Sequence, residues 1–318
     1  MQRGGALQYL ITGGTGSLGS ALTLRLLREG HKVRTLSRNQ HHVAELEAKI
    51  PSAERVRFSP IEADIRDVSA VRDAVQGVNQ VIHAAAQKVI HQCEYNPVEA
   101  ADININGTAA VARACWEEGV EKALFISTDK ACAPSTHYGK TKSVAETIWL
   151  GSNVKRPWSK PFCAIRYGNV WGSNGSVIWT FRRQYEAGQS VQVTDPKMTR
   201  FHLRITDAVN WCLRALEVLG PGELLVPKLP SYAILDLVSV AAPHAEILTT
   251  GRRPGEKLSE SLISDNESPY CAKEEETYYV LKPGEVQQAG GWEYTSSTNQ
   301  WRLSREQLKE EIEWLSPS

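Results

Sequence analysis

Short apolar runs alternate with longer amphipathic stretches along the first half of the chain. The apolar runs predict strands at residues 9–12, 32–36, 56–59, 81–84, 123–127 and 162–166. The stretches between them predict helices at residues 17–29, 43–49, 68–75, 98–118 and 137–150. Because strands that alternate with helices form parallel crossover units, we expect an α/β fold with a doubly wound parallel sheet.

The alternation weakens after about Gly168, where prolines and glycines divide the chain into short elements. We therefore expect residues 1–168 to form the sheet domain. Residues 169–318 are expected to form a smaller, irregular region, from which some segments return to the sheet. Such sheets bind ligands at the carboxyl ends of their strands, so this second region is expected to close over that edge and hold a substrate. A last amphipathic helix is predicted at residues 304–314.

Composition and charge narrow the classes of function. The 318 residues include 36 Lys and Arg and 36 Asp and Glu, a balance that does not favour nucleic-acid binding. Six scattered cysteines without a Cys-x-x-Cys pair indicate reduced thiols rather than disulfides or a metal site. No apolar run reaches the roughly 18 residues of a membrane span, and residues 1–7 lack the apolar core of a signal peptide. We expect a cytoplasmic protein without a nucleic-acid, membrane or metal partner.

A glycine-rich turn, TGGTGSLG over residues 12–19, joins the first predicted strand to the first helix. Its first glycine suits a tight turn, its second lets the backbone approach a pyrophosphate, and its third lets the helix pack against the strand. The helix N-terminus then offers free N–H groups to the phosphates. The turn predicts a Rossmann dinucleotide site formed by Gly13, Thr15, Gly16, Ser17, Leu18 and Gly19.

The end of the second predicted strand indicates which dinucleotide binds. NAD sites usually place an acidic residue there, whereas this chain has Ser37 and Arg38, which can bind a 2′-phosphate. We therefore predict NADP as the cofactor; a solvated loop arginine is the alternative. Asp64 and Ile65 are expected to meet the adenine, and Ala84 leaves room where the cofactor crosses the sheet.

Tyr138 and Lys142 form a Tyr-x-x-x-Lys pair on one face of a predicted helix. A tyrosine with its usual pKa of about 10 is a poor base at neutral pH. A neighbouring ammonium and an oxidised nicotinamide would both lower that pKa, so Tyr138 could take the proton of a substrate hydroxyl. In a chain that also carries the glycine-rich turn, this pair indicates a short-chain dehydrogenase/reductase.

The fifth predicted strand leads into Thr128, Asp129 and Lys130. Thr128 can hydrogen-bond to the hydroxyl that is oxidised. Asp129 and Lys130 are not needed for simple alcohol oxidation, so an acid and a potential base here indicate a second proton transfer. An exposed salt bridge at the end of the strand is the alternative interpretation.

Further motifs give the chain a closer resemblance. It resembles the extended short-chain dehydrogenases of the inverting UDP-N-acetylglucosamine 4,6-dehydratase type, which serve polysaccharide biosynthesis. The matching segments are residues 12–19, 127–131, 138–142, 166–170, 175–177, 198–201, 226–228, 253–258 and 294–296. The resemblance implies that a UDP-sugar is held by Lys88, Asn169, Ser173, Val177, Arg200 and Arg253, and that Asn104 belongs to the cofactor site.

The resemblance also implies a reaction on one bound cofactor, which is regenerated. Tyr138 would deprotonate the C4 hydroxyl as C4 is oxidised, Lys130 would remove the C5 proton, and Asp129 would protonate the departing C6 hydroxyl. Reduction at C6 would then give a 4-keto-6-deoxy sugar inverted at C5, for a surface glycan or a nonulosonic acid. A lysine base needs a depressed pKa, which burial beside a cationic nicotinamide and Lys142 would give Lys130. A homo-oligomer is implied, based on a dimer and extending to a hexamer.

Two other functions stay open at this point. A nucleotide-sugar 4- or 5-epimerase would share the oxidation at C4 or the proton removal at C5 but would not need an acid such as Asp129. A cofactor-binding regulator without turnover is disfavoured by the retained Tyr138 and Lys142. The chain also departs from the family pattern near the ligand, for example at residues 88–90 and 133–136, which leaves the sugar and the outcome at C5 open.

Overall fold

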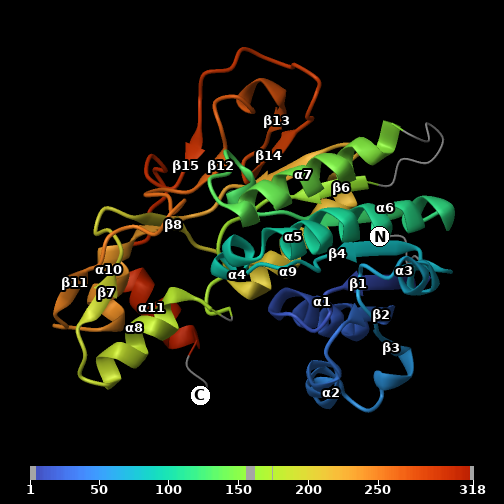
Figure 1. The fold of residues 1–318 in the computed structure, drawn as a ribbon, viewed down its shortest axis with the longest axis horizontal. Helices are drawn as coiled ribbons and strands as arrows, with labels where there is room; N and C mark the ends of the chain where they lie inside the picture. Colours follow the sequence, from blue (N-terminus) through green and yellow to red (C-terminus); the bar gives the residue numbers. More distant parts are fainter. Residues whose placement is uncertain (1–4, 155–161, 174, 316–318) are drawn as a thin grey trace.

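A nine-stranded sheet forms the centre of this computed structural model, which describes residues 5–154, 162–173 and 175–315 (Figure 1). Across the sheet the strands are β13 (Cys271–Glu274), β14 (Tyr278–Leu281), β9 (Leu224–Pro227), β6 (Phe162–Ile165), β5 (Lys122–Ile126), β4 (Gln80–His83), β1 (Gln8–Thr12), β2 (Lys32–Ser37) and β3 (Phe58–Glu62). From β3 to β9 every pair is parallel, whereas β14 pairs antiparallel with both β9 and β13. This confirms the predicted α/β fold, with two antiparallel strands added at one edge.

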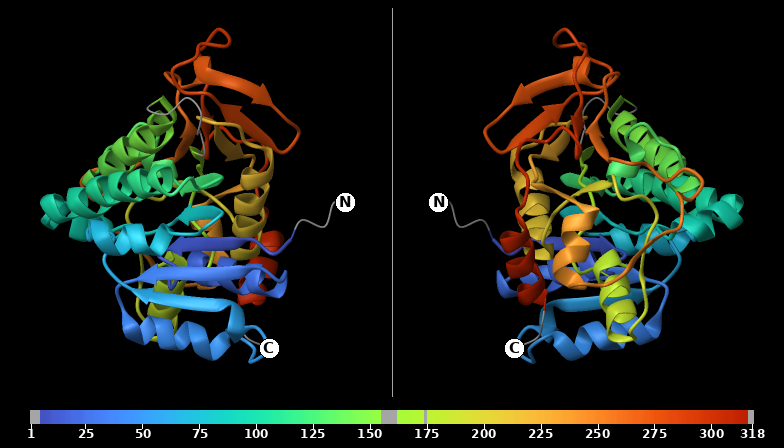
Figure 2. Two further views of the ribbon diagram at one scale, coloured as in Figure 1. Left: turned by 90° about the vertical axis from the view of Figure 1, so that its right-hand side faces the viewer. Right: turned by 90° about the vertical axis from the view of Figure 1, so that its left-hand side faces the viewer.

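Helices cover both faces of the sheet (Figure 2). On one face α1 packs against α9, and on the other α6 lies between α3 and α7. Their bounds are α1 (Ser17–Arg28), α9 (Ile205–Val218), α3 (Val68–Val75), α6 (Thr108–Glu117) and α7 (His137–Gly151). The central strands are buried on both sides, as β-branched and apolar runs in a parallel sheet require. The nine strands and these helices are called the sheet domain below.

Three predicted elements have different bounds in the structure. The helix α2 (Gln40–Lys49) begins three residues before the expected position because the Asn39 side chain caps it by accepting a hydrogen bond from His42 N. The strand predicted at 56–59 was placed too early, since Val56 lies in a 3₁₀ turn and is 87% exposed. The helix predicted at 98–118 runs without a break from Pro97 to Glu117, but its middle, Asp102–Gly107, is π-helical and joins α5 (Pro97–Ala101) to α6.

A second hydrophobic core lies beside the sheet domain, in what we call the smaller lobe (Figure 1, lower left). The lobe consists of α8 (Val177–Glu186), α10 (Ile234–Ala241), α11 (Arg305–Leu315) and two strand pairs, β7 (Val191–Val193) with β11 (Ile247–Thr249) and β8 (Thr199–Phe201) with β10 (Ser231–Ala233). The predicted terminal helix is confirmed as α11. Three further elements belong to neither group: α4 (Ile90–Tyr95), which packs against α5 and α7, and the strands β12 (Ser261–Ile263) and β15 (Tyr294–Thr295), which pair with each other. Within the described residues no helix has both the length and the apolar character to span a bilayer.

A buried arginine joins three parts of the fold. The Arg166 guanidinium, just after β6, donates to both carboxylate oxygens of Glu146 on α7, at 2.6 and 3.2 Å. It also donates to Glu267 Oε1 at 2.7 Å and to Leu262 O at 3.0 Å. Burial opposes the charge of Arg166, but the two carboxylates outweigh that effect and raise its pKa well above the ordinary value. Arg166 therefore has a structural role in the segment 166–170, which also contains Asn169.

We expect Arg166→Met to lower the free energy of unfolding by about 3–5 kcal/mol, because it leaves the buried Glu146 and the partly buried Glu267 without their cation. Chemical denaturation followed by circular dichroism measures this loss. The exposed pair Arg214–Glu217 provides the control, since removal of Arg214 is expected to change the stability by about 0.5 kcal/mol or less. Equal small effects at both arginines would contradict the structural role of Arg166.

Candidate active site

A cavity of about 1230 Å³ lies between the carboxyl ends of the parallel strands and the smaller lobe. It is lined by most of the residues that the sequence predicts for the site. These are Gly13, Gly16, Ser17, Leu18, Gly19, Ala84, Lys88, Thr128, Asp129, Lys130, Tyr138, Lys142, Asn169, Ser173, Val177, Arg200 and Arg253. Residues as far apart in the sequence as Gly13 and Arg253 thus meet in one place, as the topology of a doubly wound sheet predicts.

The glycine-rich turn has the close approaches that a dinucleotide site needs. Gly13 has φ +69°, and a Cβ there would lie 2.8 Å from Ala85 N. A Cβ on Gly19 would lie 2.3 Å from Gly13 O, so α1 packs against the turn as closely as its backbone allows. At Gly16, by contrast, an added Cβ meets nothing nearer than Gly13 O, at 3.3 Å. The turn and the N-terminus of α1 therefore fit a pyrophosphate.

Six predicted cofactor residues do not line this cavity: Thr15, Ser37, Arg38, Asp64, Ile65 and Asn104. Four of these pair with one another beside the end of β2. Thr15 N donates to Ser37 Oγ at 3.3 Å, and Arg38 Nη1 lies 3.5 Å from Asp64 Oδ2. The Arg38 side chain is 52% exposed, so it is available to an anion from solvent. Hydrogen bonds from Arg66 lower the pKa of Asp64 to about 2.

The other two predicted cofactor residues have partners within the protein. The Asn104 side chain accepts from Gln87 N at 2.8 Å and donates to Gln87 O and Thr141 Oγ1 at 3.0 and 2.9 Å. Ile65 is buried where a Cβ on Gly107 would lie 2.6 Å from its side chain. Both fix the backbone beside the site, and a contact of either with a dinucleotide stays a prediction.

Asp129 and Lys130 form a hydrogen-bonded ion pair at the end of β5. Lys130 Nζ lies 3.0 Å from each carboxylate oxygen of Asp129 and 3.0 Å from Asn169 Oδ1. Thr128 Oγ1 donates to Asp129 Oδ1 at 2.8 Å. The Asp129 side chain is 1% exposed and that of Lys130 is 20% exposed. The pair therefore lies inside the cavity, which argues against an exposed salt bridge at the strand end.

The electrostatics of Lys130 correct one expectation. Burial opposes the charged form, as the sequence predicts, but the carboxylates of Asp129 and Glu260 outweigh burial and raise the pKa of Lys130 above its ordinary value. The prediction of a depressed pKa did not include two carboxylates around one ammonium. A role as base therefore requires that Lys130 first transfer a proton to a neighbour.

Tyr138 lies on α7, close to this ion pair and in the same cavity. The Thr136 hydroxyl caps α7 by accepting from Gly139 N at 3.1 Å, and a Cβ on Gly139 would lie 2.3 Å from Lys130 O. The glycine after the tyrosine thus lets the helix touch the Asp129–Lys130 turn. Burial raises the pKa of Tyr138 to about 12, while the ammonium of Lys130 and the hydroxyl of Thr128 act in the opposite direction. The cation that favours the phenolate here is Lys130 rather than Lys142.

Lys142 is buried one turn further along α7. Its Nζ donates to Ile126 O at 2.8 Å and lies 3.8 Å from the centre of the Phe125 ring. Burial lowers the pKa of Lys142 to about 7, and Glu146 only partly opposes this. Such a residue costs stability when it is charged, and a strongly lowered pKa inside a cavity is typical of a group that serves a ligand there.

We expect Lys142→Met to stabilise the ligand-free protein by about 2 kcal/mol at pH 7. Between pH 7 and 10 the unfolded chain binds the proton that folded Lys142 has lost, so this residue makes stability rise with pH over that window. The gain from Lys142→Met is therefore largest at pH 7 or below and disappears near pH 10. Chemical denaturation at several pH values measures it, with the exposed Lys140→Met as the control; equal pH slopes for the two variants would contradict the assignment.

The arginines predicted to hold a substrate differ in their surroundings. Arg200, on β8, is mostly buried, and its Nη1 donates to Thr199 O and Leu258 O at 2.7 and 3.1 Å. Arg253 lies exposed in the loop before β12, at the edge of the cavity. Arg200 is therefore already held in position by the fold, whereas Arg253 is free to approach a ligand.

Two carboxylates of the cavity, Glu260 and Glu94, were missed by the sequence analysis. Glu260 lies close to both Lys130 and Arg200. Glu94 on α4 accepts from His137 N at 2.6 Å and pairs with the imidazole of His137, which fixes α4 to the start of α7. No local pattern indicates Glu94, but Glu260 follows the 253–258 motif by two residues. Outside the cavity, one group of three possible metal ligands occurs in the described part of the chain, His41, His42 and Glu45, all exposed on α2.

Comparisons with known proteins agree with this geometry. Residues 9–282 match the family described as "Polysaccharide biosynthesis protein". The chain is 38% identical over 278 residues to a protein of Campylobacter jejuni subsp. jejuni serotype O:2 named UDP-N-acetylglucosamine 4,6-dehydratase (inverting), covering 86% of this chain and 82% of that protein. It is also 33% identical over 323 residues to a Rickettsia rickettsii protein named UDP-glucose 4-epimerase, covering 95% of this chain and 94% of that one.

A solved structure is similar over the whole fold. The X-ray structure of Pen from Bacillus thuringiensis superposes with a TM-score of 0.88 at 31% sequence identity, and the match covers 96% of this chain and 98% of Pen. The similarity therefore includes the smaller lobe as well as the sheet domain.

Proposed function

The chain belongs to the polysaccharide biosynthesis protein family, and on this premise we propose that it is an NADP-dependent 4,6-dehydratase of a UDP-N-acetylhexosamine. The substrate we propose is UDP-N-acetylglucosamine, and the product is the 4-keto-6-deoxy sugar inverted at C5. The reaction is that of a hydro-lyase, in the service of surface-glycan or nonulosonic-acid synthesis in the cytoplasm, and we expect a homo-oligomer.

One observation carries this proposal: an acid and a base are hydrogen-bonded to each other in the same cavity as Tyr138. Lys130 Nζ lies 3.0 Å from Asp129, so one proton transfer along this bond gives a neutral amine and a neutral carboxyl group. These are the two forms that removal of a proton from C5 and protonation of a hydroxyl at C6 require. An alcohol dehydrogenase would need neither group.

The residues of the glycine-rich turn, with Tyr138 and Lys142, would hold the cofactor. When bound, the nicotinamide supplies the acceptor and later the donor of a hydride. Tyr138 takes the proton of the C4 hydroxyl on its phenolic oxygen. Lys142 is buried within a cavity that would hold the dinucleotide, and its ammonium would hydrogen-bond to hydroxyl groups there in place of Ile126 O.

The elimination then proceeds on the Asp129–Lys130 pair. The C4 ketone acidifies the C5 proton, which Lys130 Nζ accepts, while Asp129 gives its proton to the C6 oxygen. Water leaves as the C5–C6 double bond forms, and the ion pair of ammonium and carboxylate is restored. The fold favours this ion pair, so the elimination ends in the charge state that the structure shows. Lys130 can return a proton to C5 when C6 is reduced.

Arg38 is the residue on which the proposed preference for NADP rests. We expect Arg38→Ala to raise the Kd of NADP⁺ about tenfold, since one charge-assisted contact to the 2′-phosphate is lost, and to leave the Kd of NAD⁺ unchanged. Isothermal titration calorimetry measures both constants. Arg28→Ala, at the far end of α1, is the control. An equal change for both dinucleotides would remove Arg38 from the 2′-phosphate.

A 4-epimerase is the second candidate, favoured by the relatives that carry this name. It would use Tyr138 in the same way, and water would not leave from C6. Incubation with UDP-N-acetylglucosamine and NADP⁺ in D₂O, followed by NMR, separates the two. We expect a 6-methyl signal and deuterium at C5, without net reduction of added NADP⁺. A C4 epimer without a 6-methyl signal would replace the dehydratase by the epimerase, and the configuration at C5 decides between inversion and retention.

A further inference from the structure

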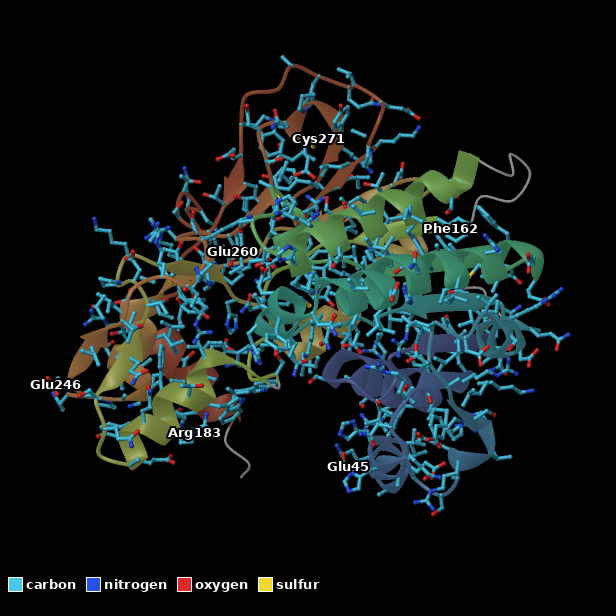
Figure 3. All side chains as sticks on the ribbon, in the orientation of Figure 1. Glu45, Phe162, Arg183, Glu246, Glu260 and Cys271 are labelled. Carbon is cyan, nitrogen blue, oxygen red and sulfur yellow. The ribbon has the colours of Figure 1, made fainter. Side chains whose placement is uncertain are left out.

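Glu260, labelled in Figure 3, is a buried carboxylate between two cations of the cavity. Its Oε1 lies 3.6 Å from Lys130 Nζ and 3.7 Å from Arg200 Nε. The residue is 4% exposed, so water screens these interactions little. Glu260 therefore lies between the proposed base and Arg200, the arginine that is predicted to hold the substrate.

The position of Glu260 is fixed through its backbone. Glu260 N donates to Ser296 Oγ at 2.9 Å, and Ser296 N donates to Glu260 O at 2.8 Å. The Ser296 hydroxyl also donates to Thr199 O at 3.1 Å, in the residue before Arg200. Three segments distant in the sequence are thus joined at one serine, and the spacing between Glu260 and Arg200 is part of the fold.

The second carboxylate oxygen of Glu260 is not needed for this attachment. Oε2 is buried and has no hydrogen-bond partner among the described residues. Leaving a buried polar atom unpaired costs about 1–3 kcal/mol, so a glutamate at this position is not explained by stability. The negative charge that Glu260 presents to the cavity explains why a glutamate occupies this position.

The charges around Lys130 alternate in sign. Asp129 and Glu260 are carboxylates on either side of the ammonium, and Arg200 lies beyond Glu260. The phenols of Tyr138 and Tyr232 also face this group, and burial raises the pKa of each to about 12, so both are neutral at physiological pH. Of these neighbours, Asp129 and Glu260 favour the protonated form of Lys130, whereas Arg200 opposes it.

We propose that Glu260 is a positioning residue: it holds the Lys130 ammonium beside Asp129 and Asn169, and it joins this group to Arg200 in one chain of alternating charges. Glu260 keeps Lys130 protonated between turnovers and favours the ammonium that the elimination forms when Lys130 accepts the C5 proton. The role in turnover rests on the proposed function, but the effect of Glu260 on Lys130 does not.

The test therefore measures the protonation of Lys130 in the absence of a sugar substrate. The protein is labelled with acetic anhydride at pH 9, where only the neutral amine reacts, and acetylation of Lys130 is followed by peptide mass spectrometry. Glu260→Gln is expected to raise the labelling rate of Lys130 about tenfold, which corresponds to a pKa lower by about one unit. Lys228, which pairs with Glu274 outside the cavity, is the internal control and should not change.

Two further variants test the proposal independently, one that keeps the negative charge and one that removes the neighbouring positive charge. Glu260→Asp retains the charge and is expected to label more slowly than Glu260→Gln. Arg200→Gln removes the opposing cation and is expected to lower the labelling rate of Lys130 several-fold, so it decides the question if Glu260→Gln does not fold. An unchanged labelling rate of Lys130 in a folded Glu260→Gln or Arg200→Gln variant overturns the proposal. Failure of sugar turnover alone would overturn only the proposed function.

Discussion

Replacement of Tyr138 by Phe is expected to lower kcat for the 4-keto-6-deoxy sugar by a factor of about 10³. The reason is that the phenolic oxygen is the group placed to take the C4 proton, and Phe offers no acceptor at that position. Because burial holds the pKa of Tyr138 at about 12, the phenolate is scarce at neutral pH, and kcat of the parent protein should rise with pH. Product formation by NMR measures both effects.

The matched control is Tyr9→Phe, which removes a hydroxyl from another buried tyrosine outside the cavity. Burial raises the pKa of Tyr9 to about 12 as well, so the two tyrosines differ in location rather than in ionisation. We expect Tyr9→Phe to retain kcat, and both variants to keep the thermal unfolding midpoint within a few degrees. A Tyr138→Phe variant with the kcat of the parent would exclude Tyr138 as the base.

The succession of the first six strands along the chain and the place of the glycine-rich turn could be predicted because both depend on local patterns. The glycines of residues 12–19 are needed where a Cβ would collide, and the structure shows those collisions at Gly13 and Gly19. The bounds that failed depend on single side chains instead. Asn39 extends α2 by capping it, and the exposed Val56 mimics a strand residue although it lies in a turn.

The environment of the ion pair could not be predicted in the same way. Glu260 is 130 positions after Lys130, and only folding brings its carboxylate to 3.6 Å from Nζ. Burial alone predicts the wrong direction for the pKa of Lys130, because Asp129 and this contact with Glu260 both favour the charged amine. Asn104 is a similar case. Its side-chain amide forms hydrogen bonds with Gln87 and Thr141, and no local sequence motif connects these residues.

Lys130→Ala is expected to abolish water loss, with a decrease of at least about 10³ in the rate of elimination, and to leave the first step intact. Because Tyr138 remains, C4 is still oxidised, and the reaction stops at the 4-keto sugar, which cannot lose water. Reduced cofactor should therefore accumulate in the variant, up to one equivalent per site, whereas the parent protein returns its hydride and shows no net reduction. Absorbance of the reduced nicotinamide in a single turnover measures this.

The variant also removes the cation beside the buried Asp129, which costs a few kcal/mol of stability, so lost activity alone would be ambiguous. Reduced cofactor resolves the ambiguity, because an unfolded protein produces none. Lys228→Ala, outside the cavity, should behave like the parent protein. Elimination at an unchanged rate in Lys130→Ala would assign the base to another group. Loss of both steps in a folded variant would show that the Lys130 ammonium is also needed by Tyr138, whose phenolate it favours.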